Sequence, residues 1–322
     1  MFKYADYIYE IYKEKSFTKA AKNLFISQPA LSAAVKKLEE ELHIKIFDRS
    51  APLALTLEGT AYIKAIEDMY NIKKDFENYI IDVSNLNVGS ICISGANFIS
   101  SYVIPKIIVP FSKKHPTISV ELVESNSKTL INELINENID LLIDYNIDET
   151  LIDAHPLFSE TILLCVPRLL KINSKLSDYA LSNEDIRNNV HLSDNIKKIK
   201  LNDLKDESFL MMKSGNSMNY HGFNMCHEAG FEPQVSIYFD QLMTSYNMAS
   251  SGLGICFVTD TLVKEVSPND NLLYYKIDSE YAKRTVYILH KKKRYVNKVI
   301  REFMNTASEV YKNMWLFPPN RK

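Results

Sequence analysis

Glycine is scarce in this chain of 322 residues, which contains only eight glycines and eleven prolines. The only Gly-x-Gly is Gly252–Gly254, and neither a third glycine nor a Gly-Lys-Ser/Thr follows it. Rossmann and P-loop folds hold phosphates in loops of closely spaced glycines, so the sequence gives these nucleotide-binding folds no support. The composition, with 46% apolar and 24% charged residues, is that of a globular protein, and the length predicts about two domains.

Cysteines and long apolar runs are also few. The four cysteines, Cys92, Cys165, Cys226 and Cys256, lie far apart and form no Cys-x-x-Cys pair, so neither a zinc ribbon nor a disulfide framework is predicted. No metal or cofactor is expected. The N-terminus has no apolar signal segment, and the longest apolar stretches are too short to span a membrane. We therefore expect a cytoplasmic protein with buried free thiols and no membrane partner.

The chain as a whole lacks the positive charge of a protein that coats nucleic acid, since its formal net charge is -2. The charge is uneven, however: residues 13–37 hold six lysines and a single glutamate. The same segment has the apolar spacing of short helices, with capping candidates at Ser16 and Ser27 and Pro29 in a first helical turn. This form is that of a helix-turn-helix, although exposed lysines alone are more often simply solvated.

A small hairpin or wing is expected over residues 44–56, followed by a helix that Thr56 caps. Apolar residues along this helix follow a three-four spacing that only Lys73 interrupts; they are Tyr62, Ile66, Met69, Phe76, Ile80 and Val83. So regular a seam favours pairing with a helix of another copy, because no second long helix is near in sequence. The alternative is that this helix packs on its own domain.

The second half alternates strands and helices. The strand at 88–94, the helix at 101–112, the strand at 118–123, the helix at 129–136 and the strand at 140–145 predict a parallel sheet. A second set follows, with strands at 161–167, 208–212, 235–239, 255–258 and 284–290 and helices at 218–229, 241–250 and 296–311. Two α/β lobes fit this succession better than one very large sheet.

The motifs of the first half resemble the DNA-binding domain of LysR-type transcriptional regulators. They are Ser16–Leu24, Ser27–Ser32, Leu38–Leu42, Phe47–Arg49 and Leu55–Gly59, in that order and at the spacing of the family. Further landmarks of the family's effector domain are Val88–Ser90, Pro105, His115–Pro116, Asn138–Asp140, Glu228–Pro233 and Ser251–Gly254. The resemblance covers nearly the whole chain, and only residues 169–199 and the tail after 307 look unlike the family.

The resemblance implies an α/β fold with an N-terminal winged helix-turn-helix (1–57), a dimerisation helix (58–87), a two-lobed effector domain like periplasmic binding proteins (88–305) and a tail (306–322). Lobe I would take residues 88–160 and 268–305, and lobe II residues 161–267. The chain would cross between the lobes near 159–161 and 264–269. The residues expected at DNA are Thr18, Lys19, Ser27, Gln28, Pro29, Ser32, Lys36 and Arg49.

Each of these residues has a physical role at DNA. Gln28 can contact adenine through two hydrogen bonds, whereas Lys19 and Lys36 suit phosphates. Ala33 and Ala34 stand where many relatives carry longer polar side chains, so we expect DNA shape to supply a larger share of the specificity. His43 replaces a glycine that is common at this turn, and the turn is expected to differ locally.

A small effector is expected in a cleft between the two lobes, beyond the carboxyl ends of the strands. The candidates there are Asn97, Ser100, Ser101, Asn126, Ser127, Tyr145, Ser214, Asn216, Ser217 and Asp240. Each one alone is more often an ordinary turn former or helix cap than a ligand contact. The sequence does not decide between an anionic and a zwitterionic effector.

The predicted function is therefore effector-controlled regulation of transcription by a homotetramer built as a dimer of dimers. Its partners would be double-stranded promoter DNA, the effector, further copies of itself and RNA polymerase. A solute-binding module without transcriptional output is the main alternative. An enzyme is disfavoured because no histidine stands beside a serine or cysteine in a nucleophile motif. His221, Cys226 and His227 do not share one tight helical face for a metal.

Overall fold

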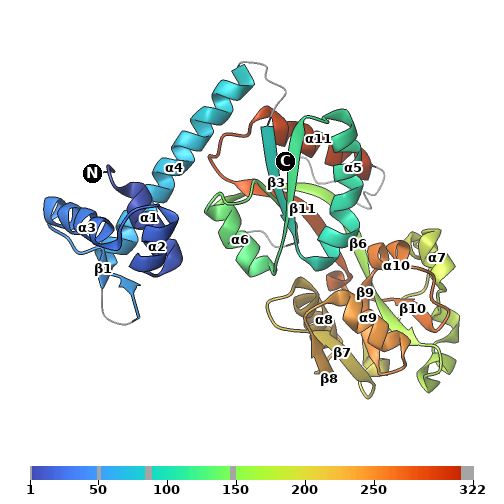
Figure 1. The fold of residues 1–322 in the computed structure, drawn as a ribbon. Helices are drawn as coiled ribbons and strands as arrows, with labels where there is room; N and C mark the ends of the chain where they lie inside the picture. The colour runs from blue at the N-terminus through green and yellow to red at the C-terminus, as the bar shows by residue number, and fades with distance from the viewer. Residues whose placement is uncertain (1, 49–51, 84–88, 146–149, 313–322) are drawn as a thin grey trace. The chain divides into compact units, whose positions relative to one another are not determined.

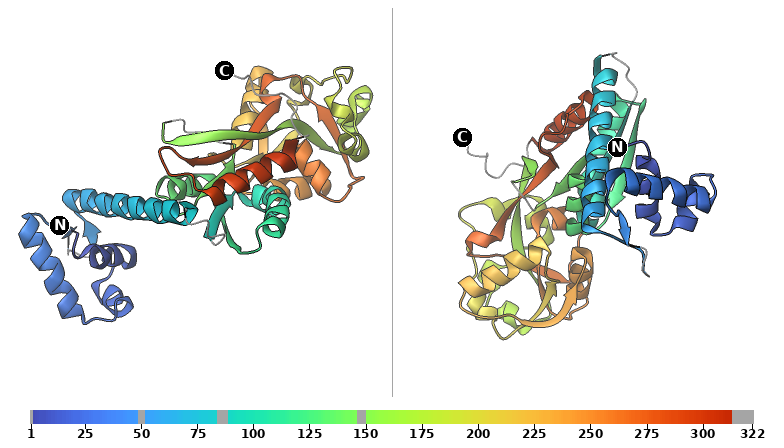
Figure 2. Two further views of the ribbon diagram at one scale, coloured as in Figure 1. Left: turned by 90° about the horizontal axis from the view of Figure 1, so that it is seen from above. Right: turned by 90° about the vertical axis from the view of Figure 1, so that its left-hand side faces the viewer.

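The computed structural model describes residues 2–48, 52–83, 89–145 and 150–312. The chain divides into two compact units, residues 1–84 and 85–322, which appear in Figures 1 and 2. The wing residue Arg49, the predicted linker at 85–87 and the end of the predicted tail lie outside the described residues.

The first unit begins with the helices α1 (Ala5–Glu14), α2 (Phe17–Asn23) and α3 (Gln28–Leu42). The predicted caps are confirmed: the hydroxyl oxygens of Ser16 and Ser27 accept hydrogen bonds from the N–H groups of Lys19 and Ala30, both at 3.3 Å. The three helices enclose an apolar core in which Leu31 is fully buried. This core fixes the orientation of α3, whose polar face is left at the surface.

A two-stranded wing and a long helix follow: β1 (Phe47–Asp48), β2 (Ala54–Leu55) and α4 (Leu57–Val83). Thr56 caps α4 as expected, since its Oγ1 accepts the N–H of Gly59 at 2.8 Å. A Cβ at Gly59 would lie 1.9 Å from the carbonyl oxygen of Ile46. Only glycine therefore allows the start of α4 to pack against the backbone of Ile46, just before β1.

The predicted seam of α4 has two parts with different surroundings. Tyr62 and Ile66 are buried in the core of the first unit, so the first half of the helix packs on its own domain. Farther along, Ile72, Phe76 and Ile80 are 71%, 62% and 48% exposed. Packing on its own domain therefore holds for the first half of the helix. The second half leaves an apolar stripe at the surface, and its pairing with another copy stays a prediction.

The second unit is an α/β structure of two lobes, built on a sheet that mixes parallel and antiparallel strands. The first lobe holds β3 (Gly89–Gly95), α5 (Ile104–Lys114), β4 (Ile118–Glu124), α6 (Ser127–Ile135), β5 (Leu141–Asp144), β11 (Lys283–Lys291) and α11 (Lys298–Tyr311). The second lobe holds α7 (Asn183–Arg187), β7 (Ser208–Met212), α8 (Ser217–Glu228), β8 (Gln234–Phe239), α9 (Leu242–Ser250), β9 (Ile255–Thr259), α10 (Asp260–Glu265) and β10 (Leu272–Lys276). With β6 (Ile152–Pro167) between the lobes, the strands follow the order β4-β3-β5-β11-β6-β9-β7-β8. Strand β3 is parallel to both β4 and β5, which confirms the parallel β-α-β-α-β unit.

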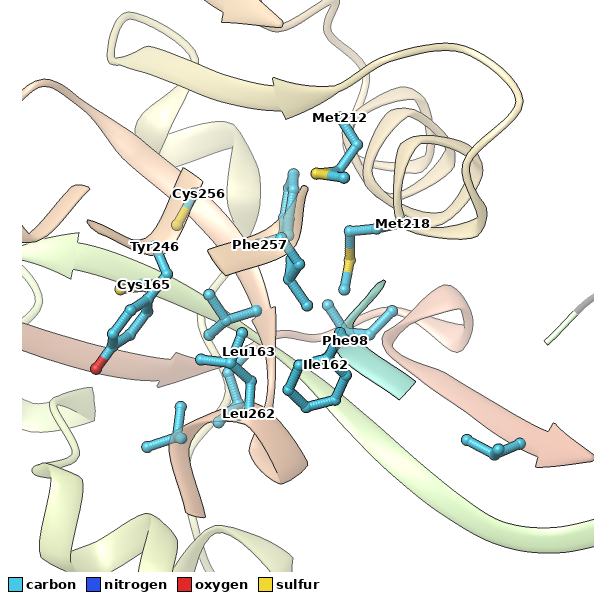
Figure 3. Packing of buried hydrophobic residues seen from close by; sticks show 14 of the residues in the cluster. Phe98, Ile162, Leu163, Cys165, Met212, Met218, Tyr246, Cys256, Phe257 and Leu262 are labelled. Carbon is cyan, nitrogen blue, oxygen red and sulfur yellow. The ribbon is translucent and has the colours of Figure 1, made fainter. Parts of the chain in front are cut away.

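One strand, β6 (Ile152–Pro167), belongs to both lobes (Figure 1). Residues 152–161 pair with β11 in the first lobe, whereas residues 162–167 pair with β9 and β10 in the second. Buried apolar side chains surround this crossing, among them Phe98, Ile162, Phe257 and Leu262 (Figure 3). Cys165 and Cys256 face each other in register on β6 and β9 and are buried free thiols.

Two expected boundaries need correction. The return to the first lobe, expected at 264–269, comes later, because β10 pairs with β6 and extends the second lobe to Lys276. The tail was expected from 306, but α11 continues to Tyr311. The Tyr311 ring stacks on Phe158 at 4.6 Å and its hydroxyl donates to the carbonyl oxygen of Val103, so the last turn of α11 belongs to the core of the first lobe.

Candidate functional site

The first turn of α3 presents polar groups to the surface. Ser27, Gln28 and Pro29 are exposed, and Ser32, one turn later, is half-buried. The Gln28 Nε2 donates to the Ser32 Oγ at 2.9 Å, which holds the amide of Gln28 along the helix. Thr18, Lys19 and Lys36 are exposed as well, and Lys36 forms a surface ion pair with Glu40 at 3.7 Å. The seven described candidates for DNA contact are thus all within reach of a partner.

A buried carboxylate that the sequence analysis missed ties α3 to the wing. Glu39 is 2% exposed, and its Oε1 accepts hydrogen bonds from the N–H groups of Ile46 and Phe47 at 2.8 and 3.3 Å. The sequence does not indicate this burial, because Glu39 belongs to an acidic run whose other members, Glu40 and Glu41, are exposed. The Glu39 side chain therefore positions the entry of the wing relative to α3.

The turn after α3 keeps a glycine-like conformation although it contains no glycine. His43 has φ 54° and ψ 35°, the left-handed conformation that glycine adopts at no steric cost. Its N–H donates to the carbonyl oxygen of Glu40, and the N–H of Ile44 to that of Glu39. A histidine thus holds the backbone conformation that favours glycine, and the expected local difference from the family at this turn stays a prediction.

The second unit contains a cavity between its two lobes with a volume of about 60 Å³. Fifteen residues line it: Ala96, Asn97, Phe98, Ile99, Ser127, Asp144, Tyr145, Met212, Asn216, Ser217, Met218, Asp240, Gln241, Leu242 and Arg284. The carboxyl ends of β5, β7 and β8 and the starts of α6, α8 and α9 contribute to this lining. This is the location predicted from the strand order.

Six of the ten predicted effector residues line this cavity: Asn97, Ser127, Tyr145, Asn216, Ser217 and Asp240. The other four, Ser100, Ser101, Asn126 and Ser214, do not. Ser100 is buried and its hydroxyl donates to the carbonyl oxygen of Gly95 at 2.9 Å. Asn126 caps α6 by accepting the Thr129 N–H, and Ser101 and Ser214 are exposed outside the lining. Ser100 and Asn126 therefore have structural roles, and Ser101 and Ser214 have no contact with the cavity.

The sequence analysis missed the charged residues of the cavity that lie on strands. Arg284, in β11, is directly opposite Glu160 of β6, and its Nε donates to the Glu160 Oε2 at 2.9 Å. The Arg284 Cζ also lies 3.6 Å from the centre of the Tyr145 ring. Burial raises the pKa of Tyr145 above its ordinary value, and Arg284 partly opposes this increase, so the hydroxyl stays protonated at neutral pH.

Carboxylates come from both lobes. Asp144, the last residue of β5, is 1% exposed, and its Oδ1 accepts the N–H of Tyr145. Asp240 follows β8 and forms an exposed ion pair with Lys213 at 2.7 Å. The cavity therefore combines one guanidinium and two carboxylates with amides, hydroxyls and an apolar wall.

Within residues 2–48, 52–83, 89–145 and 150–312, no group of three or more histidine, cysteine, aspartate or glutamate side chains could hold a metal ion. His221, the first member of the weak cluster in α8, instead contacts the carbonyl oxygen of Tyr281 through Nδ1 at 2.7 Å. Over the same described ranges, no helix is long and apolar enough to cross a membrane.

Two family models match the chain. Residues 2–60 match the bacterial regulatory helix-turn-helix protein of the lysR family, and residues 84–312 match the LysR substrate binding domain. An uncharacterized HTH-type transcriptional regulator of Bacillus subtilis, YcgK, is 26% identical over 322 residues, which cover 96% of this chain and 94% of the relative. A probable RuBisCO transcriptional regulator of Emiliania huxleyi is 27% identical over 308 residues, covering 93% and 91%.

Solved structures share the fold. A full-length OxyR from Pseudomonas aeruginosa superimposes with a TM-score of 0.71 at 20% identity, covering 98% of this chain and 97% of that one. CbnR in complex with its target DNA gives a TM-score of 0.63 at 16% identity, covering 96% and 99%. The architecture is thus shared along almost the full length of each chain.

Proposed function

This chain belongs to the LysR family of transcriptional regulators, and on that premise we propose that α3 reads promoter DNA under the control of a small molecule in the cavity of the second unit. The observation that carries this proposal is the exposed first turn of α3, which presents Ser27, Gln28 and Pro29 from a rigid three-helix core. Recognition helices read base edges with these N-terminal residues.

The proposed DNA contacts divide into two groups. Gln28 makes two hydrogen bonds to an adenine and Pro29 packs on a thymine methyl, while Ser27 and Ser32 reach phosphates or base edges. Thr18, Lys19, Lys36 and the wing residue Arg49 contact the backbone or the minor groove and position the domain. Base-specific contacts are therefore few, and we assign the remaining specificity to the shape of the DNA.

The proposed assembly is a dimer of dimers. The exposed apolar stripe of α4, formed by Ile72, Phe76 and Ile80, would pair with the same stripe of a second copy. We further propose residues 1–57 as the DNA-binding domain, 58–87 as the dimerisation helix and 88–311 as the effector domain. The protein acts in the cytoplasm, where it contacts RNA polymerase at the promoter.

The proposed control is a shift between arrangements of the two lobes. Because the cavity wall comes from both lobes, a ligand in it makes more contacts in one arrangement of the lobes than in another. Such a ligand can shift the equilibrium only by its difference in affinity for the two states. The proposed result is a change in the spacing of the DNA-reading helices on the promoter.

The test is selection of duplexes from a random DNA library by the full-length protein, followed by fluorescence anisotropy at several salt concentrations. We expect a shared sequence with two half-sites, bound at least about a thousandfold more tightly than unrelated DNA. Enrichment of no sequence, together with binding that does not depend on salt, would contradict the proposal and favour a solute-binding module.

A further inference from the structure

The size and the apolar wall of the cavity limit the effector. The volume is about 60 Å³, and a water-sized group needs about 10–15 Å³ of such space, so about four to six non-hydrogen atoms fit in this arrangement of the lobes. Part of the wall is apolar, with Phe98, Met212, Met218 and Leu242 all buried (Figure 3 shows the first three). The effector is therefore a compact organic molecule with a short apolar group.

The guanidinium of Arg284 offers hydrogen-bond donors from the first lobe. The side chain is 5% exposed, its Nε donates to the Glu160 Oε2 at 2.9 Å, and its Cζ lies 3.6 Å from the centre of the Tyr145 ring. Within the described ranges of the chain, the two terminal nitrogens of Arg284 donate to no protein group. A guanidinium held in this way matches the two oxygens of a carboxylate through its terminal N–H groups.

The start of α9 offers further donors from the second lobe. Gln241 and Leu242 line the cavity at the N-terminus of this nine-residue helix, and the Gln241 side chain makes no capping hydrogen bond. In the part of the chain that the structure describes, the N–H groups of Leu242 and Met243 have no acceptor in the protein. By contrast, the side chains of Asn126 and Asn216 cap α6 and α8. An anion beside α9 would supply the missing acceptor.

Three helix N-termini meet at the wall of the cavity. Helix α6 begins there with Ser127, α8 with Ser217 and α9 with Leu242. The aligned peptide dipoles give each helix N-terminus about half a positive charge, or about 1.5 charges for the three. Since this charge acts within the first helical turn, all three helices stabilise a negative group in the cavity.

The charged side chains do not cancel this preference. Arg284 forms an ion pair with Glu160, and Asp240 forms one with Lys213, so each pair is neutral. Asp144, which also lines the cavity, adds at most one further negative charge. The positive charge of the three helix N-termini exceeds this contribution, so the cavity as a whole favours an anion.

We propose that the effector is a compact organic monocarboxylate. Its carboxylate accepts hydrogen bonds from the terminal nitrogens of Arg284 and from the start of α9, and so contacts both lobes at once. Its short apolar chain packs against Phe98, Met212 and Met218. This assignment rests on the proposed function of the cavity as the effector site.

The experiment is isothermal titration of the full-length protein with ligands of similar size that differ in charge: propionate, propionamide, L-alanine and sulfate. Acetate, butyrate, L-lactate and pyruvate extend the carboxylate set. We expect at least one carboxylate to bind at least about tenfold more tightly than propionamide, L-alanine and sulfate, because only it meets the guanidinium, the helix N-termini and the apolar wall together. Equal or tighter binding of any of these three overturns the proposal, as does an absence of binding by all five carboxylates.

A variant of α9 then locates the carboxylate. Gln241 has the extended backbone of an N-cap residue, so Gln241→Asp places a carboxylate where it accepts the N–H groups that the ligand needs. The best carboxylate ligand should bind at least about tenfold more weakly, while the thermal midpoint stays the same or rises, because aspartate is a good N-cap. Unchanged affinity of the Gln241→Asp protein contradicts the assignment of α9.

A second variant tests the guanidinium. Arg284→Lys keeps a positive charge beside Glu160 but removes the pair of terminal nitrogens, and it should weaken the best carboxylate at least about tenfold. Ser101→Ala, outside the cavity lining, is the control for both variants and should change nothing. Unchanged affinity of the Arg284→Lys protein contradicts the assignment of Arg284.

DNA binding by the same preparations separates this inference from the proposed function. Anisotropy with the selected duplex reports on the DNA-binding domain without regard to the ligand. If the duplex binds and the amide, the amino acid or sulfate is the preferred ligand, the regulator assignment stands and the carboxylate is wrong. If no duplex is selected, the proposed function fails whatever the cavity binds.

Discussion

At the scale of single residues, a histidine pair on β6 and β11 has a defined arrangement of hydrogen-bond donor and acceptor. The Nε2 atoms of His155 and His290 are 3.0 Å apart, and the His290 Nδ1 lies 3.1 Å from the carbonyl oxygen of Lys291. Since a carbonyl only accepts, His290 carries its proton on Nδ1 and its Nε2 accepts from His155. A second proton on His290 would bring two N–H groups face to face.

This pair predicts a loss of stability in weak acid. Burial, and then the neighbouring His290, lower the pKa of His155 below its ordinary 6.5, while Asp153 partly opposes them. The unfolded chain therefore binds more protons than the folded one, so stability is complete above pH 6.5 and falls as the pH drops through the lowered pKa. The thermal midpoint of the second unit should fall between pH 7.5 and 5.5.

The substitution His155→Gln should reduce the fall of the thermal midpoint between pH 7.5 and 5.5, as measured by differential scanning calorimetry at the two pH values. Some pH dependence will remain, because burial also lowers the pKa of His221. His227→Gln, at an exposed histidine paired with Glu232, is the control. An unchanged fall of the thermal midpoint in the His155→Gln protein would show that His155 does not cause it.

Gln28 allows a second prediction at this scale. Its amide is held by Ser32, and the next residues, Ala33 and Ala34, offer no alternative contact to a base. Gln28→Ala should therefore reduce discrimination at one A·T pair by about 1–3 kcal/mol, while other positions of the operator keep their preference. Anisotropy with single-base operator variants measures this, with Glu41→Ala as a control on the same helix. Full retention of the preference would remove Gln28 from base readout.

The residues of the cavity show what residue types reveal before a structure is known. Ser127, Asn216 and Ser217 were found because polar groups after strands converge at one edge of a sheet. Asp144 was missed because it ends the apolar run Leu141–Ile143, and pattern reading assigns such a segment to the core. Arg284 was missed because it stands beside Lys283, and two adjacent basic residues at the start of a strand are ordinarily solvated.

At the scale of elements, α4 predicts the oligomeric behaviour of the chain. Burying Phe76 in two copies contributes about 2–3 kcal/mol from each side chain, so Phe76→Glu should weaken dimers about a hundredfold or more. Light scattering coupled to size-exclusion chromatography measures the mass as a function of concentration. Lys64→Glu places the same charge on an exposed position of the first half of this helix, which packs on its own domain, and should leave the mass unchanged. An unchanged mass for Phe76→Glu would place the interface elsewhere.

Most helices and strands were predictable from periodicity and caps, but the first half of β6 was not. Pro156 lies inside it, and proline is rare within central strands because it cannot donate to the ladder. The structure accommodates Pro156 at an irregularity, where the pairing of β11 shifts between Val286 and Tyr287. Such a bulge depends on the partner strand, which lies about 130 residues later in the sequence, so local pattern cannot reveal it.

At the scale of the whole molecule, a weak net charge is compatible with DNA binding if the DNA-binding domains of several copies add their contacts to phosphates. The lysines of residues 13–37 belong to one small domain, and a dimer presents that domain twice. Lys19→Ala should weaken binding to operator and unrelated DNA alike. The slope of the logarithm of the binding constant against the logarithm of the salt concentration should fall by about one per DNA-binding domain, or about two per dimer. Lys175→Ala, an exposed lysine of the second unit, should leave the slope unchanged. A loss confined to the operator would instead assign Lys19 to base recognition.

The strand shared by both lobes also sets the order in which the protein folds as it is made. The second lobe is one continuous piece of chain up to Lys276, whereas the first lobe needs β11 and α11, which leave the ribosome last. At a synthesis rate of about 5–20 residues per second, β5 waits on the order of ten seconds for its neighbour β11. The nascent first lobe thus exposes an unpaired edge during that interval, and chaperones that hold β-rich intermediates have their substrate there.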